Sequence, residues 1–324
     1  MVAALAGVSR ATVSRVVNDV PSVDEEIAAK VRQAILAVNY TPNRAARSLA
    51  SRRPNSVTLI VPESTSKVFA DPFFASVVQG VALYLADTDY TLNMVIASEA
   101  KPEKTRAFLL GGNVAGALVV SHHAGDRSWT HLSDYIPMVF AGRPLGESAS
   151  YYVDVDNEAA AAGATRLLIK RGRTNIATIA GPQDMPPGID RVSGWRKAMA
   201  EAGLDDSLVE YGDFTLASGA KAMRRLLLGS GRPVDGLFVA NDQMAAGAYT
   251  VLQERGLRIP DDVAVVGFDD DSFATSVNPQ LTTVHHPIIE MGKKMAEILV
   301  NLIEGKDADR VTQIPTSLVV RDSA

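Results

Sequence analysis

The sequence predicts an α/β protein: a small helical unit at the N-terminus, then two successive halves built on parallel sheets. Its 324 residues are about twice the usual length of one domain. In the first forty residues apolar side chains recur three and four positions apart, as in Ile27, Val31 and Ile35, which is the period of a helix. From Ser56 onward, short β-branched runs alternate with longer amphipathic stretches, the pattern of parallel βαβ units.

The N-terminal unit is predicted to be a helix, a glycine turn and a helix, followed by a third helix. Gly7 can take the positive φ of a tight turn, and the Ser9 hydroxyl can cap the helix that follows. The third helix should run from about Asp24, as its N-cap or in its first turn, to Asn39, and Pro42 should end it. Residues 43–50 form another short helical stretch, and residues 51–55 form a polar linker.

The rest of the chain is predicted to alternate strands and helices. The first α/β half should close near Arg143 and the second should open near Asn157. We expect strands at Val57–Val61, Thr91–Ala97, Gly116–Val120, Met138–Ala141, Ile176–Ala180, Val209–Tyr211, Gly236–Ala240 and Val263–Phe268. We expect helices at Phe73–Ala86, Glu103–Gly111, Glu158–Arg171, Ile189–Ala202, Ala217–Leu228, Gln243–Arg255 and Ile288–Ile303.

Composition and charge exclude several kinds of site and several classes of protein. The chain has no cysteine, which excludes disulfides, thiolate nucleophiles, Cys-ligated zinc and iron–sulfur clusters. No apolar run reaches the ~18 to 20 residues of a membrane span, and the N-terminus lacks a secretory signal pattern, so we expect a cytoplasmic protein without a membrane partner. Residues 1–56 carry eight Lys and Arg against four Asp and Glu, whereas the remainder carries 24 against 33. Residues 1–56 are therefore net positive and the remainder is net negative, which predicts a different kind of partner for each part.

The second helix of the N-terminal unit has the side chains that a helix needs in the DNA major groove, namely short or hydrogen-bonding groups on one face. Val13, Val16 and Val17 should face inward. The residues that can share the opposite face are Arg10, Ala11, Ser14, Arg15 and Asn18. The arginines could contact guanine, and Thr12 and Ser14 suit phosphate or base contacts. The alternative is a helical hairpin whose polar face is only solvated.

Motifs along the whole chain resemble those of the lactose repressor (LacI/GalR) family of transcriptional regulators. AGVSRATVSRVVN at residues 6–18 and YTPNRAARSLASRR at residues 40–53 are similar to its DNA-binding headpiece and hinge, at the family spacing. DPFF at 71–74, GIDRVSGW at 188–195, VANDQMAAGA at 239–248, VVGFDD at 265–270 and LTTVHHP at 281–287 are similar to its core motifs.

The resemblance implies a helix-turn-helix headpiece at residues 1–42, a hinge helix and linker at 43–56, and a two-lobed core at 57–324 that binds an effector and dimerises. The core would have the type I periplasmic-binding-protein fold. The residues matching DNA-binding positions are Ser9, Arg10, Ala11, Thr12, Ser14, Arg15, Asn18, Asn43, Ala46 and Leu49. Leu49 would wedge into the central minor-groove step, which requires a symmetric partner. A homodimer on a pseudopalindromic double-stranded DNA operator follows, and the absence of a leucine-heptad tail after Arg321 favours a dimer.

The resemblance also implies a pocket for a carbohydrate effector. Sugars require aromatic rings for their apolar faces and planar polar groups for their hydroxyls. The residues matching the family pocket are Phe73, Phe74, Arg191, Asn241 and Asp269, with Phe214 and His286 as weaker matches. The alternative interpretations are a core aromatic for Phe73, a surface salt bridge for Arg191 and a helix N-cap for Asp269.

Three departures from the family pattern matter. Met1 stands where relatives have a polar residue, so we expect a first helix barely over one turn and without a cap; either the start is assigned too late or this form binds DNA poorly. Gly142 stands where the family often has Asp, and His285-His286 replace Arg or Lys followed by Gln. The missing carboxylate leaves room, which favours a disaccharide or glucoside over a monosaccharide.

Catalytic and metal sites are not predicted, and no cofactor is expected. The chain has no Walker A or G-x-G-x-x-G motif. Neighbouring histidines at 122–123 and 285–286 would point to opposite faces of an extended segment, so neither pair chelates well. The acidic run 269–271 is interpreted as a ligand clamp and a solvated turn. We therefore predict a repressor of sugar-utilisation genes that a carbohydrate releases from DNA. The alternatives are a solute-binding protein for sugar uptake, an enzyme of sugar metabolism, and a family member that uses a corepressor.

Overall fold

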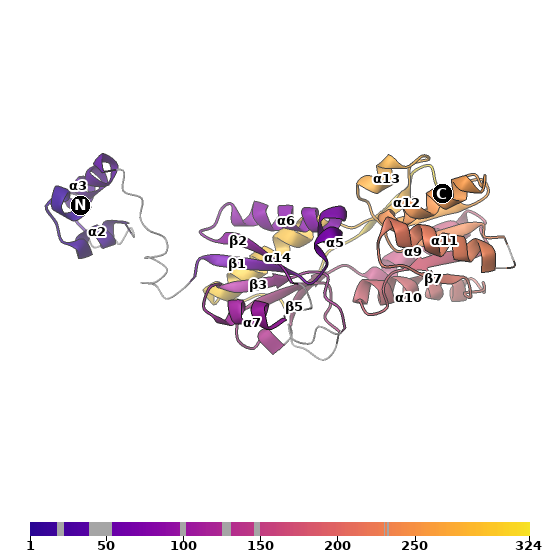
Figure 1. The fold of residues 1–324 in the computed structure, drawn as a ribbon, viewed down its shortest axis with the longest axis horizontal. Helices are drawn as coiled ribbons and strands as arrows, with labels where there is room; N and C mark the ends of the chain where they lie inside the picture. Colours follow the sequence, from indigo (N-terminus) through magenta and orange to yellow (C-terminus); the bar gives the residue numbers. More distant parts are fainter. Residues whose placement is uncertain are drawn as a thin grey trace. The chain divides into compact units, whose positions relative to one another are not determined.

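The chain divides into two units, Met1–Pro54 and Asn55–Ala324. The computed structural model describes residues 1–17, 23–38, 54–97, 102–124, 131–145, 150–229, 231 and 233–324. Figure 1 shows the small helical unit at the N-terminus and the larger α/β unit that follows it in the chain. Among the described residues, no helix combines the length and the apolar character that crossing a membrane requires.

The first unit contains the three predicted helices: α1 (Val2–Ala6), α2 (Arg10–Val17) and α3 (Glu25–Ala37). Gly7 ends α1 with a φ of 68°, as the predicted turn requires. The Ser9 hydroxyl accepts from the Thr12 N–H at 3.1 Å, and the Asp24 carboxylate accepts from the N–H groups of Glu26 and Ile27, so both predicted caps are confirmed.

The core of the first unit joins all three helices. It is formed by five buried apolar side chains: Val2, Val16, Ala28, Val31 and Ala34. The helix α1 has only five residues, and Met1 gives it no side-chain cap, as the sequence predicts.

The second unit contains two six-stranded sheets, each the centre of one lobe. The first lobe has the order β11-β5-β4-β3-β1-β2. Its strands are β1 (Ser56–Val61), β2 (Thr91–Ile96), β3 (Gly116–Val119), β4 (Met138–Ala141), β5 (Tyr151–Asp154) and β11 (Val311–Gln313). The second lobe has the order β12-β10-β9-β8-β6-β7. Its strands are β6 (Ile176–Ala180), β7 (Val209–Tyr211), β8 (Gly236–Val239), β9 (Ala264–Asp269), β10 (Thr282–His285) and β12 (Ser317–Val319).

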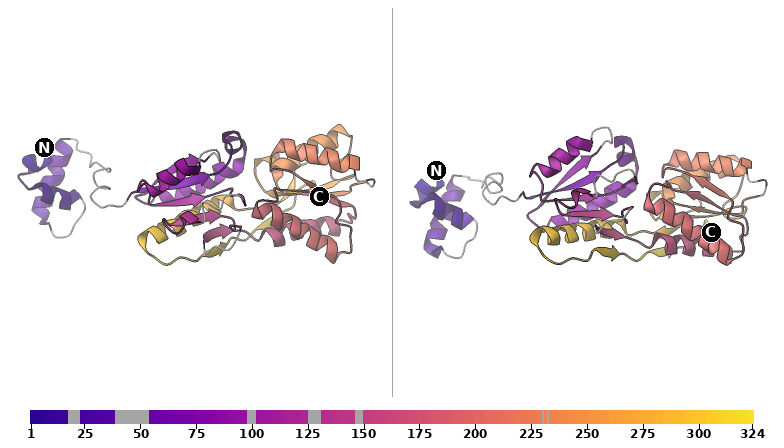
Figure 2. Two further views of the ribbon diagram at one scale, coloured as in Figure 1. Left: turned by 60° about the horizontal axis from the view of Figure 1, so that its bottom comes forward. Right: turned by 90° about the horizontal axis from the view of Figure 1, so that it is seen from below.

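Helices cover both faces of each sheet, because strands buried on both sides must be packed on both sides. In the first lobe α5 (Thr65–Ala70), α6 (Pro72–Leu85) and α14 (Ile288–Glu304) lie on one face, and α7 (Pro102–Leu110) lies on the other. In the second lobe α11 (Leu216–Gly229) and α12 (Asp242–Glu254) lie on one face, α9 (Asn157–Lys170) and α10 (Pro186–Glu201) lie on the other, and α13 (Ser272–Ser276) contacts α12. Figure 2 shows the layers from two further directions.

The two halves are not successive in the chain, so that part of the prediction is wrong. The chain crosses between the lobes from β5 to α9, from β10 to α14 and from β11 to β12. Helix α14 packs against α6 in the first lobe, where Gly80 and Gly292 let the backbones meet; a Cβ on Gly80 would lie 2.1 Å from the Ile289 carbonyl oxygen. Two connections near the C-terminus therefore join the lobes in addition to the central one.

All eight predicted strands and all seven predicted helices of this unit are present; β4, β6 and β7 have the predicted ends, and the ends of the others are shifted. The strands β5, β10, β11 and β12 and the helices α5 and α13 were not predicted. Each has three to six residues, so a period is hard to recognise in them, although β7, with three residues, was predicted. Every strand pair is parallel except β10 with β12. Strand β9 continues to Asp269, one residue beyond its predicted end, and Asp271, not Asp269, caps α13.

Candidate functional site

The outer face of α2 has the predicted polar character. Arg10, Ala11, Ser14 and Arg15 are exposed, whereas Val16 is buried and Val13 and Val17 are partly buried. Ser9 is exposed at the start of the helix, and its hydroxyl lies 2.9 Å from the hydroxyl of Thr12. The helix therefore presents two arginines and short side chains on the face away from its core.

Four predicted DNA-binding residues lie outside the described part of the chain. These are Asn18, Asn43, Ala46 and Leu49.

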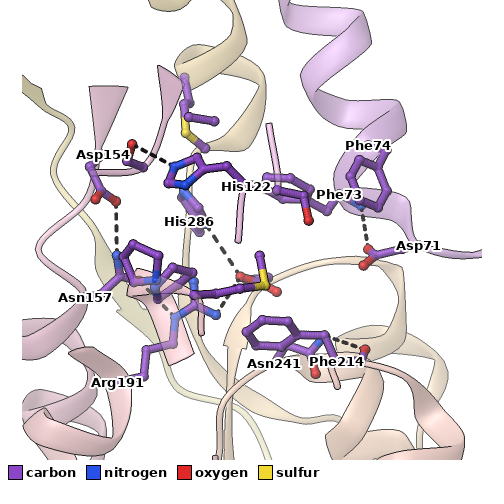
Figure 3. A pocket seen from close by; sticks show the side chains of 18 of the residues that line it. Asp71, Phe73, Phe74, His122, Asp154, Asn157, Arg191, Phe214, Asn241 and His286 are labelled. Atoms are coloured by element: carbon purple, nitrogen blue, oxygen red, sulfur yellow. Dashed lines mark hydrogen bonds and ion pairs between the residues drawn. The ribbon is translucent and has the colours of Figure 1, made fainter. Parts of the chain in front are cut away.

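A pocket lies between the lobes of the second unit, at the carboxyl ends of several strands. All seven predicted effector-binding residues line it: Phe73, Phe74, Arg191, Phe214, Asn241, Asp269 and His286. The space between the lining side chains is about 730 Å³, including its opening to solvent. Figure 3 shows Asp154, Asn157 and Arg191 on one side of this pocket, and Asp71, Phe73 and Phe74 on the other. One wall is thus polar and the opposite wall is largely aromatic.

Arg191 is buried at the centre of the polar wall and is not a surface residue. Its Nε donates to Asn157 Oδ1 at 2.9 Å, and one terminal nitrogen donates to the Ala240 carbonyl at 2.6 Å and to Asp269 Oδ1 at 3.4 Å. Its guanidinium carbon lies 3.6 Å from the centre of the Phe268 ring. Burial lowers the pKa of Arg191, and the Asp269 charge opposes this effect. The guanidinium is therefore held in one plane before any ligand arrives.

Asp269 is held in a strained conformation. Its φ is 109°, and the next residue, Asp270, has a φ of 60°. Among the described residues, two other non-glycine positions have positive φ, Ser121 and Phe214, and both line the pocket. Side chains with a Cβ rarely adopt this region, and such strain concentrates at functional sites. At Asp269 it directs the carboxylate toward Arg191 and His286.

His286 lies buried between two aromatic rings. Its ring centre is 6.4 Å from that of Phe73 and 6.3 Å from that of Phe268. Its Nδ1 is 3.5 Å from Asp269 Oδ1, and neither ring nitrogen makes a hydrogen bond within the described part of the chain. A buried polar group in this situation is a candidate for contact with a ligand or a water molecule.

The two adjacent histidine pairs separate as expected. His285 turns away from the pocket to Asp270, with Nδ1 at 3.0 Å from Oδ2. His122 lines the pocket, with Nε2 3.3 Å from the Gly142 carbonyl oxygen, whereas His123 contacts Glu63 and Asp184. Across the described ranges, no cluster of three or more His, Asp or Glu side chains could hold a metal ion.

The Asn241 side chain is already hydrogen-bonded within the protein, and it fixes the position of Phe214 in the pocket. Its side-chain oxygen caps α12 through the Met244 N–H at 3.0 Å, and its amide donates to the Phe214 carbonyl at 3.0 Å. This bond fixes the positive-φ turn that carries the Phe214 ring.

Several lining residues were missed by the sequence analysis. Asp71 caps α6 through the Phe73 N–H at 2.9 Å, and burial, assisted by the Asp269 charge, raises the pKa of Asp71 to about 6. Asp154 accepts from the Arg143 and Val155 N–H groups and from the Asn157 amide. The others are Lys67, Ser121, His122, Ala141, Asn157, Met185, Pro186, Pro187 and Met291, and Gly142, named above as a departure, lines the pocket as well. Asp71 stands inside the DPFF motif and could have been found there; Asp154 is the last residue of the unpredicted strand β5 and gives no such signal.

Two family models match the chain. Residues 2–43 match the model described as "Bacterial regulatory proteins, lacI family", and residues 165–324 match a periplasmic binding protein-like domain. The HTH-type transcriptional regulator CelR of Thermobifida fusca is 43% identical over 330 aligned positions, which span 100% of this chain and 97% of that protein. The ribose operon repressor of Escherichia coli K12 is 34% identical over 308 positions, which span 93% of this chain and 92% of the repressor.

Solved structures agree with these matches. A complex of the transcriptional regulator CelR with cellobiose has a TM-score of 0.80 and 41% identity, and the match covers 100% of this chain and 98% of that one. The lac repressor dimer bound to operator and the anti-inducer ONPF has a TM-score of 0.87 and 27% identity, and the match covers 99% and 97% of the two chains. The named relatives are regulators of transcription, and none is named as an enzyme.

Proposed function

The chain belongs to the lacI family of bacterial regulatory proteins and is a DNA-binding regulator of transcription, and we propose that its effector is a disaccharide of glucose such as cellobiose. In this proposal a homodimer represses genes of carbohydrate utilisation, and the sugar releases it from its operator. Because an operator lies on the chromosome, the proposal places the protein in the cytoplasm.

The observation that carries the proposal is the division of the pocket into a polar and an aromatic wall. A pyranose ring has hydroxyls around its edge and apolar faces above and below, so it needs planar polar partners and flat apolar partners at right angles. Arg191, Asp269 and Asn157 form the polar wall, and Phe73 and Phe214 supply rings. This combination supports a carbohydrate ligand over a purely apolar or purely charged one.

Two further observations support a ligand of two rings. A Cβ built on Gly142 would meet no atom closer than 3.9 Å, so the position where relatives often have an aspartate is open. The structure of the relative CelR was solved with cellobiose. The sugar class therefore rests on pocket shape together with this relative.

The proposed operator contact follows from α2. Arg10 and Arg15 would contact bases or phosphates in the major groove, with Ser9, Ala11, Thr12 and Ser14 beside them. Asn18, Asn43, Ala46 and Leu49 would complete the contact, with Leu49 as the minor-groove wedge. A wedge of this kind and a two-fold operator both require a second copy of the chain, so the proposal includes a homodimer.

Release would occur through linkage between lobe closure and DNA binding. The proposed sugar contacts come from both lobes, Phe73 from the first and Arg191 from the second, so a bound sugar favours the arrangement in which both can reach it. The first lobe begins at β1, directly after the segment that connects it to the DNA-binding unit. The sugar can shift operator affinity only by its differential affinity for the two lobe arrangements, typically about 1 to 3 kcal/mol.

The effector proposal is tested by calorimetry and melting with cellobiose, glucose and ribose. Cellobiose at a hundred times its Kd should stabilise the second unit by roughly 2.7 kcal/mol, and the two monosaccharides should give much less at equal concentration. Stabilisation by ribose or glucose alone would contradict a two-ring effector. Operator binding measured across the same cellobiose titration should fall; a rise would show a corepressor mode.

The DNA proposal is tested with two altered chains. A chain beginning at Asn55 lacks the first unit, and it should bind cellobiose like the parent and lose specific operator binding. Arg15→Ala should weaken specific binding by ~1 to 3 kcal/mol and relax the preference at one base position. Lys30→Ala, on an exposed position of α3 in the same unit, is the matched control for loss of one positive charge. Equal losses in the two variants would contradict base recognition by Arg15.

A further inference from the structure

A second polar cluster joins the lobes beside the proposed sugar contacts. His123 follows β3 in the first lobe, and its Nδ1 lies 2.8 Å from Oδ2 of Asp184, which follows β6 in the second lobe. A backbone hydrogen bond joins the same two segments, because the Ala124 N–H donates to the Asp184 carbonyl at 2.8 Å. One short segment of each lobe therefore meets the other through a side chain and through the backbone.

Glu63 anchors the histidine from within the first lobe. It follows β1, and its Oε1 lies 3.3 Å from His123 Nε2, 2.7 Å from Lys67 Nζ and 2.6 Å from Ser121 Oγ. The Glu63 side chain is only 10% exposed. The ring of His123 is thus held between a buried carboxylate of its own lobe and a carboxylate of the other lobe.

The charges of this cluster are consistent with two hydrogen bonds donated by one imidazolium. Burial alone would raise the pKa of Glu63, but hydrogen bonds from His123, Lys67 and Ser121 lower it to about 2. The hydrogen bond to Glu63, opposed by burial and assisted by Asp184, raises the pKa of His123 to about 9. At neutral pH both ring nitrogens carry a proton, so Nε2–H donates to Glu63 and Nδ1–H donates to Asp184.

Two other contacts between the lobes are weaker candidates for this role. Arg143 and Asp190 form an ion pair at 3.0 Å whose side chains are 45% and 26% exposed, against 20% and 56% for His123 and Asp184. Gln243 donates to the Ala70 carbonyl at 3.2 Å, which is a neutral bond. The His123 contact combines charge, a parallel backbone hydrogen bond and a buried anchor, Glu63, and this combination makes it the stronger candidate although Asp184 itself is half exposed.

We propose that His123, positioned by Glu63, is a latch that holds the lobes together through Asp184 and thereby sets the effector concentration to which the regulator responds. The second part rests on the proposed sugar effector; the first does not. An effector that binds only the closed arrangement has an apparent Kd equal to its intrinsic Kd divided by the closed fraction. A latch that raises this fraction lowers the sugar concentration needed for release, without touching the sugar.

The test measures lobe separation and sugar affinity independently. Because the chain has no cysteine, Ala107→Cys on α7 and Lys221→Cys on α11 place one spin label on each lobe, and both positions are exposed. Pulsed electron paramagnetic resonance then gives the distribution of distances between the two labels, and hence between the lobes, in the full-length protein without sugar. Asp184→Ala removes the acceptor from the second lobe. Glu254→Ala is the matched control, since it breaks an ion pair with Arg224 inside the second lobe at a similar exposure, 53% against 56%.

The latch predicts that Asp184→Ala broadens the distribution toward longer distances and raises the apparent Kd for cellobiose about three- to tenfold, whereas Glu254→Ala changes neither. His123→Gln should reproduce Asp184→Ala, and combining the two should add little, because they act on one contact. An unchanged distance distribution in both single variants overturns the latch. A shifted distribution with no cellobiose binding to any form supports the latch and contradicts the proposed effector.

Discussion

The two lobes hold their sides of the pocket in different ways. On the second lobe, Arg191 is fixed by three acceptors and by the Phe268 ring. Behind it, the fully buried Asp242 binds the Thr283 hydroxyl at 2.6 Å and the Asp271 N–H at 3.1 Å, and this fixes the loop after β9. On the first lobe, the half-buried Phe73 meets the edge of Phe74, with ring centres 5.4 Å apart.

This difference shows which wall of the pocket is already ordered before a ligand binds. Groups fixed by several hydrogen bonds lose little freedom when a ligand arrives, so the ordering cost of binding is small on the second lobe. The first lobe offers aromatic area, together with Asp71, whose carboxylate accepts from the Phe73 N–H; its Asp154, which three hydrogen bonds fix, lies on the side of the pocket that Arg191 occupies. We infer that the sugar is oriented by the second lobe and enclosed by the first.

The largest expected effect follows from removing the centre of the fixed wall. Arg191→Ala should weaken cellobiose binding about ten- to a hundredfold, since charge-assisted hydrogen bonds contribute roughly 1.5 to 3 kcal/mol each. Operator binding without sugar should remain normal, because the DNA-binding unit is a separate part of the chain. The measurement is operator binding across a cellobiose titration.

A matched variant sharpens this result. Arg171→Ala, at the exposed end of α9 in the same lobe, removes a charge away from the pocket and should leave the titration unchanged. Release of Arg191→Ala at the parent's cellobiose concentration would show that the second lobe does not orient the sugar.

The next effect compares one ring from each lobe. Phe73→Ala and Phe214→Ala should each raise the cellobiose Kd about five- to thirtyfold, because each removes apolar area worth about 1 to 2 kcal/mol against a sugar face. Phe214→Ala should lower the melting temperature more than Phe73→Ala, since the Phe214 ring packs tightly on Gly181, where a Cβ would lie 2.4 Å from Cζ. Calorimetry and melting of both variants check this. Equal melting losses would contradict a difference in preorganisation.

The sequence could predict those features of the molecule that have a local pattern, and it could not predict those that depend on contacts between distant segments. Long amphipathic helices have a period, so their positions were found. Strand length alone does not decide the outcome, since β7 was found and β11 and β12, also with three residues each, were not. Pocket residues inside sequence motifs, such as Arg191 and Asp269, were found because these motifs resemble the pocket motifs of the family. Asp154 was not, because its role depends on β5 ending beside Gly142, a relation between strands that local patterns do not contain.

The interleaving of the lobes escaped prediction for a similar reason. Helix α14 has an apolar face that would fit either sheet, and only the close approach of Gly292 to α6 places it on the first lobe. The two histidine pairs show the opposite case. The alternation of side chains in an extended segment was enough to predict that His285 and His286 diverge.

The smallest expected effect tests the less constrained wall through Asp71. Its pKa is raised from 3.8 to about 6, mainly by burial, so the folded protein binds a proton more tightly than the unfolded chain does. Stability must therefore fall as pH rises from about 4 to about 6, and at pH 7 the ionised carboxylate costs stability. Asp71→Asn keeps an oxygen that can accept from the Phe73 N–H and removes the charge. The free energy of unfolding at pH 7 should rise by about 1 kcal/mol, a value reduced from the full pKa difference to allow for solvent screening.

The pH dependence separates this effect from a change in packing. Below about pH 4 the parent carboxyl is protonated in both states, so the advantage of Asp71→Asn should disappear there. Denaturant unfolding of both proteins at pH 4 and pH 7 measures it. Asp87→Asn, at an exposed position after α6 in the same lobe, should give no such difference. If Asp71→Asn destabilises the protein at pH 7, the carboxylate has a stabilising partner and the first lobe is as firmly organised as the second.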